Sequence, residues 1–311
     1  MSVIGVDIGG SKVLAVRLEE TEVARRHHEI LDRDSDTIEA IADAIRAVAD
    51  GTETAIGVGV AGLVSITDRS LVWGPHVRGT NLRIGDELDR RFGLPVVVDN
   101  DANAAMVAEL ALGVASGYRN VLLVTLGTGI GGAIAIGGEV YRGGSYAGEW
   151  GHIKVERDGR LCDCGKRGCW ETIASGPALE RLAREVIDGN PNSSLARAVG
   201  DRVVSGQVVV EAADAGDETA RALVTEVGRA FGQGLADLVA IFDPDVIVVG
   251  GGLGSVGESV LAPARRVLAD SLHGGSHRLA PSVEVARLGS VAGAVGAALM
   301  AAGGFDASSQ R

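Results

Sequence analysis

Residues 3–12 read VIGVDIGGSK, and residues 121–132 read VLLVTLGTGIGG. Each segment is a short apolar run that ends in a cluster of glycines, and each is followed by another apolar run. Short apolar runs bounded by glycine are typical of buried strands joined by a tight turn. Because this unit opens both halves of the chain, the sequence predicts a duplicated α/β fold of two domains with a cleft between them.

The segments around these two hairpins alternate between strand and helix patterns. Residues 37–48 place isoleucine and valine at helical spacing, whereas residues 54–60 form a short apolar run. The longest expected helix, 217–242, contains glycines that weaken an isolated helix but permit close packing against a neighbour. The expected strands are 3–8, 13–18, 22–29, 54–60, 94–98, 121–126, 133–136 and 246–249, and the expected helices are 37–48, 84–92, 176–187, 217–242 and 291–301.

The composition of the 311 residues fits a globular protein, with 46% hydrophobic and 23% charged residues. A net charge of −12 and an aromatic content of 3% disfavour nucleic acid as a partner. No apolar stretch is long and unbroken enough to cross a bilayer, and no basic region precedes the first apolar run. We therefore expect a cytoplasmic protein with no nucleic-acid or membrane partner.

Three glycine clusters at strand ends are candidates for holding a nucleotide. A lone cluster of this kind is commonly just a tight turn, but two small hairpin tips facing a cleft bring backbone N–H groups to phosphate oxygens. In that interpretation Asp7 holds Mg²⁺ through water and Lys12 offsets phosphate charge; the alternatives are a turn-capping carboxylate and a solvated lysine. The clusters comprise Gly9, Gly10, Ser11 and Lys12; Gly127, Thr128 and Gly129; and Gly250, Gly251, Gly252 and Leu253.

The strand expected at 94–98 runs directly into Asp99, Asn100 and Asp101. Aspartate or asparagine at the start of a helix commonly caps it through a side-chain oxygen. A carboxylate at the C-terminal end of a strand, in a cleft, also suits a general base beside a substrate hydroxyl. Both interpretations of Asp101 stay open from the sequence, and Asn100 is a candidate for orienting a neighbouring hydroxyl.

The most specific local pattern lies at residues 149–152, which read EWGH, and residues 162–171, which read CDCGKRGCWE. One histidine and three cysteines form the donor set of a closed tetrahedral zinc site, in which the metal is structural. The alternative is three buried thiols and a hydrogen-bonded core histidine. The candidate ligands are His152, Cys162, Cys164 and Cys169, and they are flanked by Glu149 and Glu171.

These segments resemble the ROK family of repressors, open reading frames and sugar kinases, and more specifically its actinobacterial-type glucokinases. The resemblance is carried by VDIGGSK, VVDNDANAA, LVTLGTGIGGAI, GEWGHIKVERDGRLCDCGKRGCWE and PDVIVVGGGLG. It implies a duplicated, RNase H-like fold of the actin and hexokinase type with an active-site cleft between domains. We expect a small α/β domain at 1–115 plus 291–311, and a large one at 116–290 that contains the zinc segment 149–171.

The resemblance also implies roles for residues at matching positions. Asp101 is expected to be the general base that takes the proton from the sugar 6-hydroxyl. The phosphates are expected at residues 9–12 and 127–129, and the adenosine at residues 250–253. The other hydroxyls are expected to bind Asn100, Glu149, His152 and Glu171, with Asn81 as a further candidate. His152 is expected to offer one ring nitrogen to zinc and the other to the sugar.

The resemblance implies ATP-dependent phosphorylation of a hexose with Mg²⁺, glucose to glucose 6-phosphate, by a homodimer or homotetramer. One departure bears on the sugar: many family glucokinases have a tryptophan after the proline matching Pro75, and the segment up to Asn81 has none. Kinases for N-acetylmannosamine, mannose or allose, polyphosphate as phosphoryl donor, a non-catalytic sugar-binding protein and a sugar-sensing regulator are the alternatives. We expect an enzyme, because the first expected strand starts at Val3 with no helix-turn-helix ahead of it in this sequence.

Overall fold

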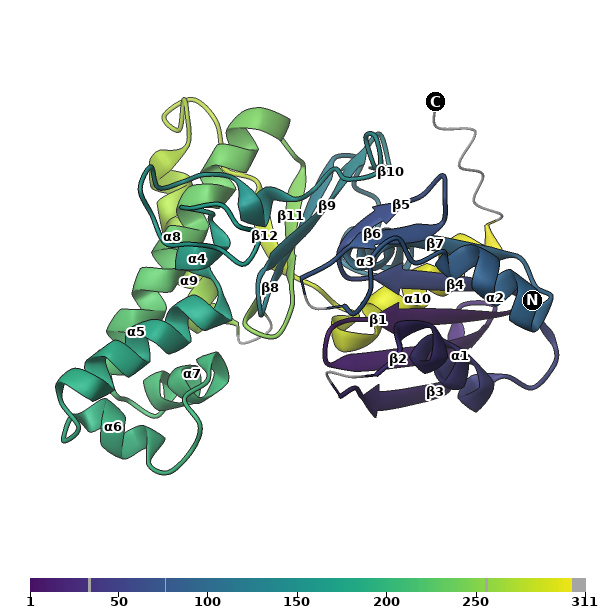
Figure 1. The fold of residues 1–311 in the computed structure, drawn as a ribbon. Coiled ribbons are helices and arrows are strands. Elements are labelled where there is room, and N and C mark those ends of the chain that lie inside the picture. Colours follow the sequence, from purple (N-terminus) through teal and green to yellow (C-terminus); the bar gives the residue numbers. More distant parts are fainter. Residues whose placement is uncertain (33–34, 76, 255–256, 304–311) are drawn as a thin grey trace. The chain divides into compact units, whose positions relative to one another are not determined.

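The computed structural model describes residues 1–32, 35–75, 77–254 and 257–303 (Figure 1). The chain forms two compact units: unit 1 contains Met1–Arg119, Ala133–Gly148 and Arg287–Arg311, and unit 2 contains Asn120–Gly132 and Glu149–Ala286. This division differs from the domains expected from the sequence chiefly in residues 133–148, which belong to unit 1. His76, in the segment that follows Pro75, lies outside the described residues.

A five-stranded sheet forms the centre of unit 1 (Figure 1). Across the sheet the strands are β3 (Glu22–Ile30), β2 (Lys12–Glu19), β1 (Ser2–Ile8), β4 (Glu53–Val60) and β7 (Val96–Asn100). β1, β2 and β3 pair antiparallel, whereas β1, β4 and β7 pair parallel, so β1, β4 and β7 end at the same edge. A separate hairpin consists of β5 (Leu63–Ser65) and β6 (Ser70–Trp73).

The two faces of this sheet pack against different helices. The helices of unit 1 are α1 (Thr37–Val48), α2 (Ile84–Phe92), α3 (Asp101–Leu112) and α10 (Ala292–Ala302), and a short 3₁₀ turn, η3 (Gly289–Val291), precedes α10. Ile4 and Val6 of β1 belong to a buried cluster with α1, whereas Val3 belongs to a cluster with α10. A Cβ on Gly5, on the same face as Val3, would lie 1.9 Å from the carbonyl oxygen of Ala294. Glycine at this position therefore permits the close approach of α10.

The second sheet repeats the strand arrangement of the first. Its order is β10 (Glu139–Tyr141), β9 (Ile130–Ile136), β8 (Val121–Leu126), β11 (Val246–Gly250) and β12 (Ser282–Val285). If the five strands of each sheet are numbered as they occur along the chain, both sheets have the order 3-2-1-4-5, and strands 1, 4 and 5 pair parallel. The repeated order confirms the duplicated α/β fold. The division between the units falls within β9, since residues 130–132 belong to unit 2 and the rest to unit 1.

The helical part of unit 2 is built around its longest helix. The elements are η1 (Trp150–His152), α4 (Glu171–Ala174), α5 (Gly176–Gly189), α6 (Ser194–Val199), α7 (Gly206–Asp214), α8 (Glu218–Phe242) and α9 (Glu258–Ser271). A Cβ on Gly228 or Gly232 of α8 would lie 2.6 Å or 2.4 Å from carbonyl oxygens of α9. The expectation that the glycines of this helix permit close packing is confirmed. Among the described residues no helix is both long enough and apolar enough to cross a membrane.

Several element boundaries differ from the sequence expectation. β7 extends through Asn100, whereas the apolar run alone predicted an end at Val98. The strand continues because Asn100 pairs with Val60 of β4, a contact that no local pattern reveals. The short hairpin β5–β6 and helices α6, α7 and α9 were not expected; α6 has only six residues, and α9 contains Pro263.

Candidate functional site

The junction between β7 and α3 separates the two interpretations of Asp101. Asn100 is the N-cap: its side-chain oxygen accepts hydrogen bonds from the N–H groups of Ala102 at 2.8 Å and Asn103 at 3.3 Å. Its side-chain amide donates to the carbonyl of Gly62 at 3.1 Å. Asp101 is the first residue of the helix, so its carboxylate is not used as the cap. The capping interpretation of Asp101 is therefore wrong.

Strand register places a row of functional candidates on one face of the first sheet. Gly59 of β4 lies opposite Asp7 of β1 on one side and Asp99 of β7 on the other. A Cβ on Gly59 would lie 3.4 Å from the Cα of Asp101, and a Cβ on Gly293 would lie 2.7 Å from the carboxyl carbon of Asp7. Asp7 therefore lies against the first turn of α10, and α3 begins beside the same strand ends.

The two half-buried carboxyl groups at this edge have raised pKa values. Burial, then repulsion from Asp101, raises the pKa of Asp7 to about 7, and Lys12 partly offsets the rise. Burial also raises the pKa of Asp101, although hydrogen bonds from backbone N–H groups and from Asn100 oppose the rise. A carboxylate whose pKa is moved toward neutrality is a better proton acceptor from a hydroxyl than an ordinary one. The environment of Asp101 thus fits a general base.

The first glycine cluster forms the tip of the β1–β2 hairpin. The N–H of Gly9 donates to the carbonyl of Lys12 at 3.0 Å, which closes the turn. Gly10, Ser11 and Lys12 are exposed, and a Cβ on Gly9 would meet no atom within 4 Å. The backbone at this tip is open to a ligand, as phosphate binding requires.

Unit 2 brings the other two glycine clusters side by side. A Cβ on Gly127 would lie 3.6 Å from the N–H nitrogen of Gly252, and the N–H of Leu253 donates to the carbonyl of Leu126 at 2.9 Å. Gly251 has φ +83°, and a Cβ there would lie 2.5 Å from the carbonyl oxygen of Leu126. Only glycine satisfies both demands, so the turn after β11 can lie this close to the turn after β8.

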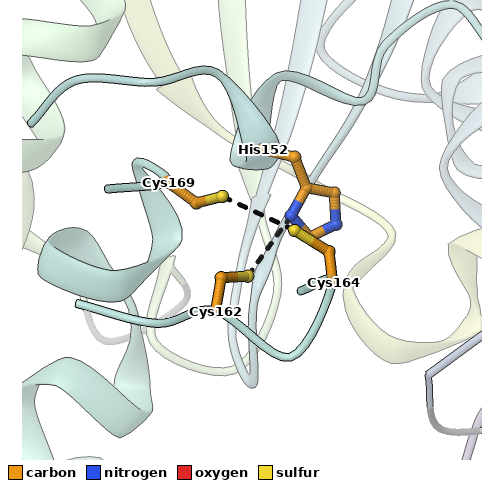
Figure 2. A group of neighbouring side chains, drawn as sticks. All are labelled: His152, Cys162, Cys164 and Cys169. Atoms are coloured by element: carbon orange, nitrogen blue, oxygen red, sulfur yellow. Dashed lines mark hydrogen bonds between the residues drawn. The ribbon is translucent and has the colours of Figure 1, made fainter. Parts of the chain in front are cut away.

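The four candidate metal ligands meet in one cluster, drawn in Figure 2. Their donor atoms all lie within 4.8 Å of one another. The Sγ of Cys162 lies 3.6 Å from Nδ1 of His152, and the Sγ atoms of Cys164 and Cys169 also lie 3.6 Å apart. Nδ1 of His152 faces the sulfurs in Figure 2, and Nε2 lies 4.0 Å from a carboxylate oxygen of Glu149.

These separations fit a tetrahedral zinc ion. With Zn–S bonds of about 2.3 Å, neighbouring sulfurs of a tetrahedron lie about 3.8 Å apart. Burial raises the pKa of the Cys162 and Cys169 thiols, so a cation is needed there to favour their thiolate forms. Gly165 and Gly168 have φ values of +85° and +78°, which let the loop wrap around the cluster.

Two tryptophans fix the ends of the metal segment to the core of unit 2. The ring of Trp170 is fully buried, stacks on Phe231 at 5.5 Å and donates its N–H to the carbonyl of Ala230 at 3.0 Å. Trp150 donates to the carbonyl of Gly131 at 3.2 Å and contacts the ring edge of Phe242. Each tryptophan is adjacent in sequence to a candidate glutamate, so the backbone of both glutamates is anchored.

Glu171 connects the metal cluster with the turn after β8. One carboxylate oxygen lies 3.3 Å from Nδ1 of His152, and the other accepts from the N–H of Ile130 at 3.4 Å. A Cβ on Gly129 would lie 2.6 Å from the carboxylate of Glu171. Gly129 therefore leaves space for this carboxylate as well as forming the turn.

Asn81 lies in the segment between β6 and α2. It has φ +53°, is exposed, and donates its N–H to the carbonyl of Val72 at 3.1 Å. It lines a hollow of about 400 Å³ beside the starts of α1 and α2. No hydrogen bond within the described ranges joins it to Asn100 or Asp101.

One buried ion pair of unit 1 had no counterpart in the sequence analysis. Nε of Arg142 donates to a carboxylate oxygen of Asp99 at 2.5 Å, and both side chains are excluded from solvent. Asp99 was visible only as the residue two positions before Asp101. Nothing near Arg142 in the sequence marks it, because its partner lies 43 residues away.

The sequence pattern that defines the ROK family matches residues 3–303. The chain belongs to the ROK family. This ROK protein is 40% identical to a glucokinase of Streptomyces coelicolor over 308 residues, which cover 96% of each chain. Its fold matches that of a ROK family glucokinase from Streptomyces griseus in complex with glucose and AMPPNP, with a TM-score of 0.90, 38% identity and coverage of 97% and 100%.

The family also contains repressors that are similar to this chain. A putative xylose repressor of a Caldicellulosiruptor species is 33% identical over 215 residues, which cover 68% of this ROK protein and 54% of the repressor. The Streptomyces coelicolor glucokinase thus matches over nearly its full length, whereas the match to the repressor covers about half of the repressor's length.

The raised pKa of Asp7 predicts a stability that depends on pH. The folded protein holds this proton up to about pH 7, whereas the unfolded chain releases it near pH 4, so stability falls as pH rises through that window. Asp7→Asn removes this cost and should stabilise this ROK protein by about 2–4 kcal/mol at pH 8, with little effect at pH 4. Urea unfolding at both pH values measures the difference. Asp43→Asn, on the exposed surface of α1, is the control for loss of one negative charge. An equal effect of Asp7→Asn at both pH values would contradict the prediction.

Proposed function

We propose that this ROK protein transfers the γ-phosphoryl group of ATP to the 6-hydroxyl of a hexose, with glucose as the preferred substrate and glucose 6-phosphate as the product. The observation that carries the proposal is the match to a glucokinase over 96% of both chains. The fold match to a glucokinase that holds glucose and AMPPNP supports the same reaction. Asp101 adds a chemical reason, because its carboxylate lies at a strand end and does not cap the helix that follows.

In this mechanism Asp101 accepts the proton of the attacking hydroxyl as the oxygen bonds to phosphorus. Phosphoryl transfer depends mainly on positioning and on stabilising charge, so a base with a moderately raised pKa is sufficient. Asn100 holds the start of α3 and thereby aims the base, and its side chain lies beside the same hydroxyl region.

The glycine clusters bind the nucleotide through backbone groups. Within residues 9–12 and 127–129, N–H groups other than those of Gly9 and Gly127, which close the two turns, donate to phosphate oxygens, and Lys12 adds positive charge. Residues 250–253 lie against the adenosine, where the absence of side chains at Gly251 and Gly252 allows close approach. Asp7 would hold Mg²⁺ through water, and the bound ion would supply positive charge against the phosphates.

The remaining hydroxyls bind polar groups of the metal segment. Glu149 and Glu171 accept hydrogen bonds from hydroxyls, and Nε2 of His152, which points away from the sulfurs, donates or accepts a further one (Figure 2). Asn81 has the weakest support among the sugar candidates, since it is exposed and lines a hollow beside the starts of α1 and α2.

A zinc ion held by the three cysteines and Nδ1 of His152 has a structural role in this proposal. Four protein donors complete a tetrahedral shell and leave no position for a reacting group. Bound zinc would hold the ring of His152 in the orientation that places Nε2 near Glu149, and the three cysteines would hold the loop between the two glutamates.

Other hexoses remain as second candidates for the same chemistry. The segment after Pro75 lacks the tryptophan of many family glucokinases, and this difference favours testing N-acetylmannosamine, mannose and allose beside glucose. A regulatory function has weaker support, because the putative xylose repressor is 33% identical and matched over 54% of its length, whereas the Streptomyces coelicolor glucokinase is 40% identical and matched over 96%.

Asp101→Asn tests the proposed base. The change keeps the size of the side chain and leaves the cap at Asn100 intact, but it removes the proton acceptor. We expect kcat for glucose with ATP and Mg²⁺ to fall about 10²–10⁴-fold, while glucose affinity and melting temperature change little. A coupled assay of ATP consumption measures kcat, and Asp43→Asn serves as the matched control on α1. Retention of full activity by Asp101→Asn would exclude Asp101 as the base.

Cys164→Ser tests the metal segment. Loss of one of four ligands should lower the zinc content of the purified protein and raise the dissociation constant for hexose about tenfold or more, through the freed ring of His152 and the loosened loop. A nucleotide probe should bind as before, within about twofold. Metal analysis and separate titrations of the two ligands give these values, with Asp163→Asn, an exposed neighbour, as the control. A wild-type protein without zinc, or a zinc-free variant with unchanged hexose affinity, would refute this role.

A further inference from the structure

The ion pair of Asp99 and Arg142 has no part in the mechanism described so far. The Asp99 side chain is 0% exposed and the Arg142 side chain 3%, so both charges are removed from water. A buried ion pair contributes little net stability compared with apolar residues of the same volume, because both groups lose their hydration. Stability alone is therefore a poor explanation for charges at this position. Their directional hydrogen bonds are better explained by the positioning of neighbouring groups.

The hydrogen bonds of Asp99 lie on both sides of Asp101 in the chain. One carboxylate oxygen accepts from the N–H of Asn100 at 2.7 Å and from the side-chain amide of Asn103 at 2.9 Å. The other oxygen accepts from Nε of Arg142 at 2.5 Å. Asp99 thus ties the end of β7 to the first turn of α3, with Asp101 between the two tied points.

Arg142 is itself held from several directions. One terminal nitrogen donates to the carbonyl of Val140 at 3.0 Å, and the other lies 3.7 Å from the sulfur of Met300 in α10. Its carbonyl accepts from the N–H groups of Ser145 at 3.0 Å and Ala147 at 3.2 Å. The guanidinium is therefore a fixed point between the end of β10, α10 and the end of β7.

The backbone of Arg142 also organises the segment that leads to Glu149. The turn closed on its carbonyl spans residues 143–147, and Gly148 and Glu149 follow directly in the chain. The same residue thus holds the start of the segment that continues to a candidate sugar ligand, and through Asp99 it holds the helix start that carries the candidate base.

We propose that Arg142 is a positioning residue for phosphoryl transfer: by holding and neutralising Asp99, it fixes the β7–α3 junction and so the direction of the Asp101 carboxylate. The inference rests on the proposed function, because it takes Asp101 as the base. Arg142 itself touches neither sugar nor nucleotide in this account.

Arg142→Met tests the inference, since methionine keeps much of the volume and removes the donors. We expect kcat to fall about 10–100-fold, while KM for ATP stays within about twofold, because the nucleotide-binding turns do not depend on this junction. Arg142→Lys keeps the charge but loses the planar fork of donors, and should retain an intermediate kcat. A structural role alone would lower the melting temperature and leave kcat of the folded enzyme unchanged.

Arg69→Met is the matched control within unit 1. Arg69 donates to Asp86 and Asp89 at 2.7 Å each and to the carbonyl of Val96 at 3.3 Å, at the opposite end of β7 from Asp99. This change should lower the melting temperature and leave kcat within about twofold of wild type.

A double variant tests whether the effect passes through Asp99. Asp99→Asn in the Arg142→Met background leaves an oxygen for the hydrogen bonds of Asn100 and Asn103 and removes the unpaired charge. We expect kcat of the double variant to recover at least about fivefold over Arg142→Met. No recovery would contradict the inference.

The outcomes separate this inference from the proposed function. A wild-type protein that phosphorylates no hexose would contradict the proposed function. The inference alone would be contradicted if the wild type is active and Asp101→Asn is inactive, but Arg142→Met keeps more than a third of the wild-type kcat. If Arg142→Met does not fold, Arg142→Lys decides, since a kcat equal to wild type would overturn the inference and a fall of threefold or more would support it.

Discussion

The capping of α3 by Asn100 is the interaction on which the candidate site of unit 1 depends. Three consecutive polar residues lie at the junction of β7 and α3, and each has a different environment. Asp99 is buried and paired with Arg142, Asn100 caps the helix, and Asp101 is neither the cap nor part of an ion pair among the described residues. Because the helix N-terminus is satisfied by the neighbour, Asp101 can act in chemistry without loss of the helix. The same arrangement explains why its surroundings raise its pKa without binding it in a salt bridge.

Small residues determine how closely neighbouring elements pack within each unit. Gly5 allows α10 to pack closely on the sheet, and Gly59 allows the start of α3 to pack closely on β4. Gly251 allows the turn after β11 to pack against the turn after β8. In unit 2 the aromatic anchors Trp150 and Trp170 fix the backbone next to each candidate glutamate, and the metal cluster shapes the loop between them. Close backbone contacts thus shape both units, and buried aromatic side chains additionally anchor the metal segment of unit 2.

The sequence predicted the features that have a local pattern. The glycine clusters, the cysteine spacing and the acidic run after β7 all lie in short segments, and the duplicated fold followed from the repeated hairpin. The cap at Asn100 could not be separated from Asp101 without the backbone geometry, since either residue type caps well. Arg142 was missed because its partner is distant in the chain, and the exposed position of Asn81 depends on a loop with no periodic pattern.

The central claim is that this ROK protein transfers phosphate from ATP to the 6-hydroxyl of glucose. The most direct measurement is ³¹P and ¹³C NMR of the products formed when the purified protein is incubated with ATP, Mg²⁺ and an equimolar mixture of ¹³C-labelled glucose, mannose, allose and N-acetylmannosamine. The account predicts that glucose is consumed first and that the new phosphate ester is attached to its carbon 6, with one ADP formed per ester. Hydrolysis of ATP without any sugar ester, or an ester on a different carbon of glucose, would contradict it.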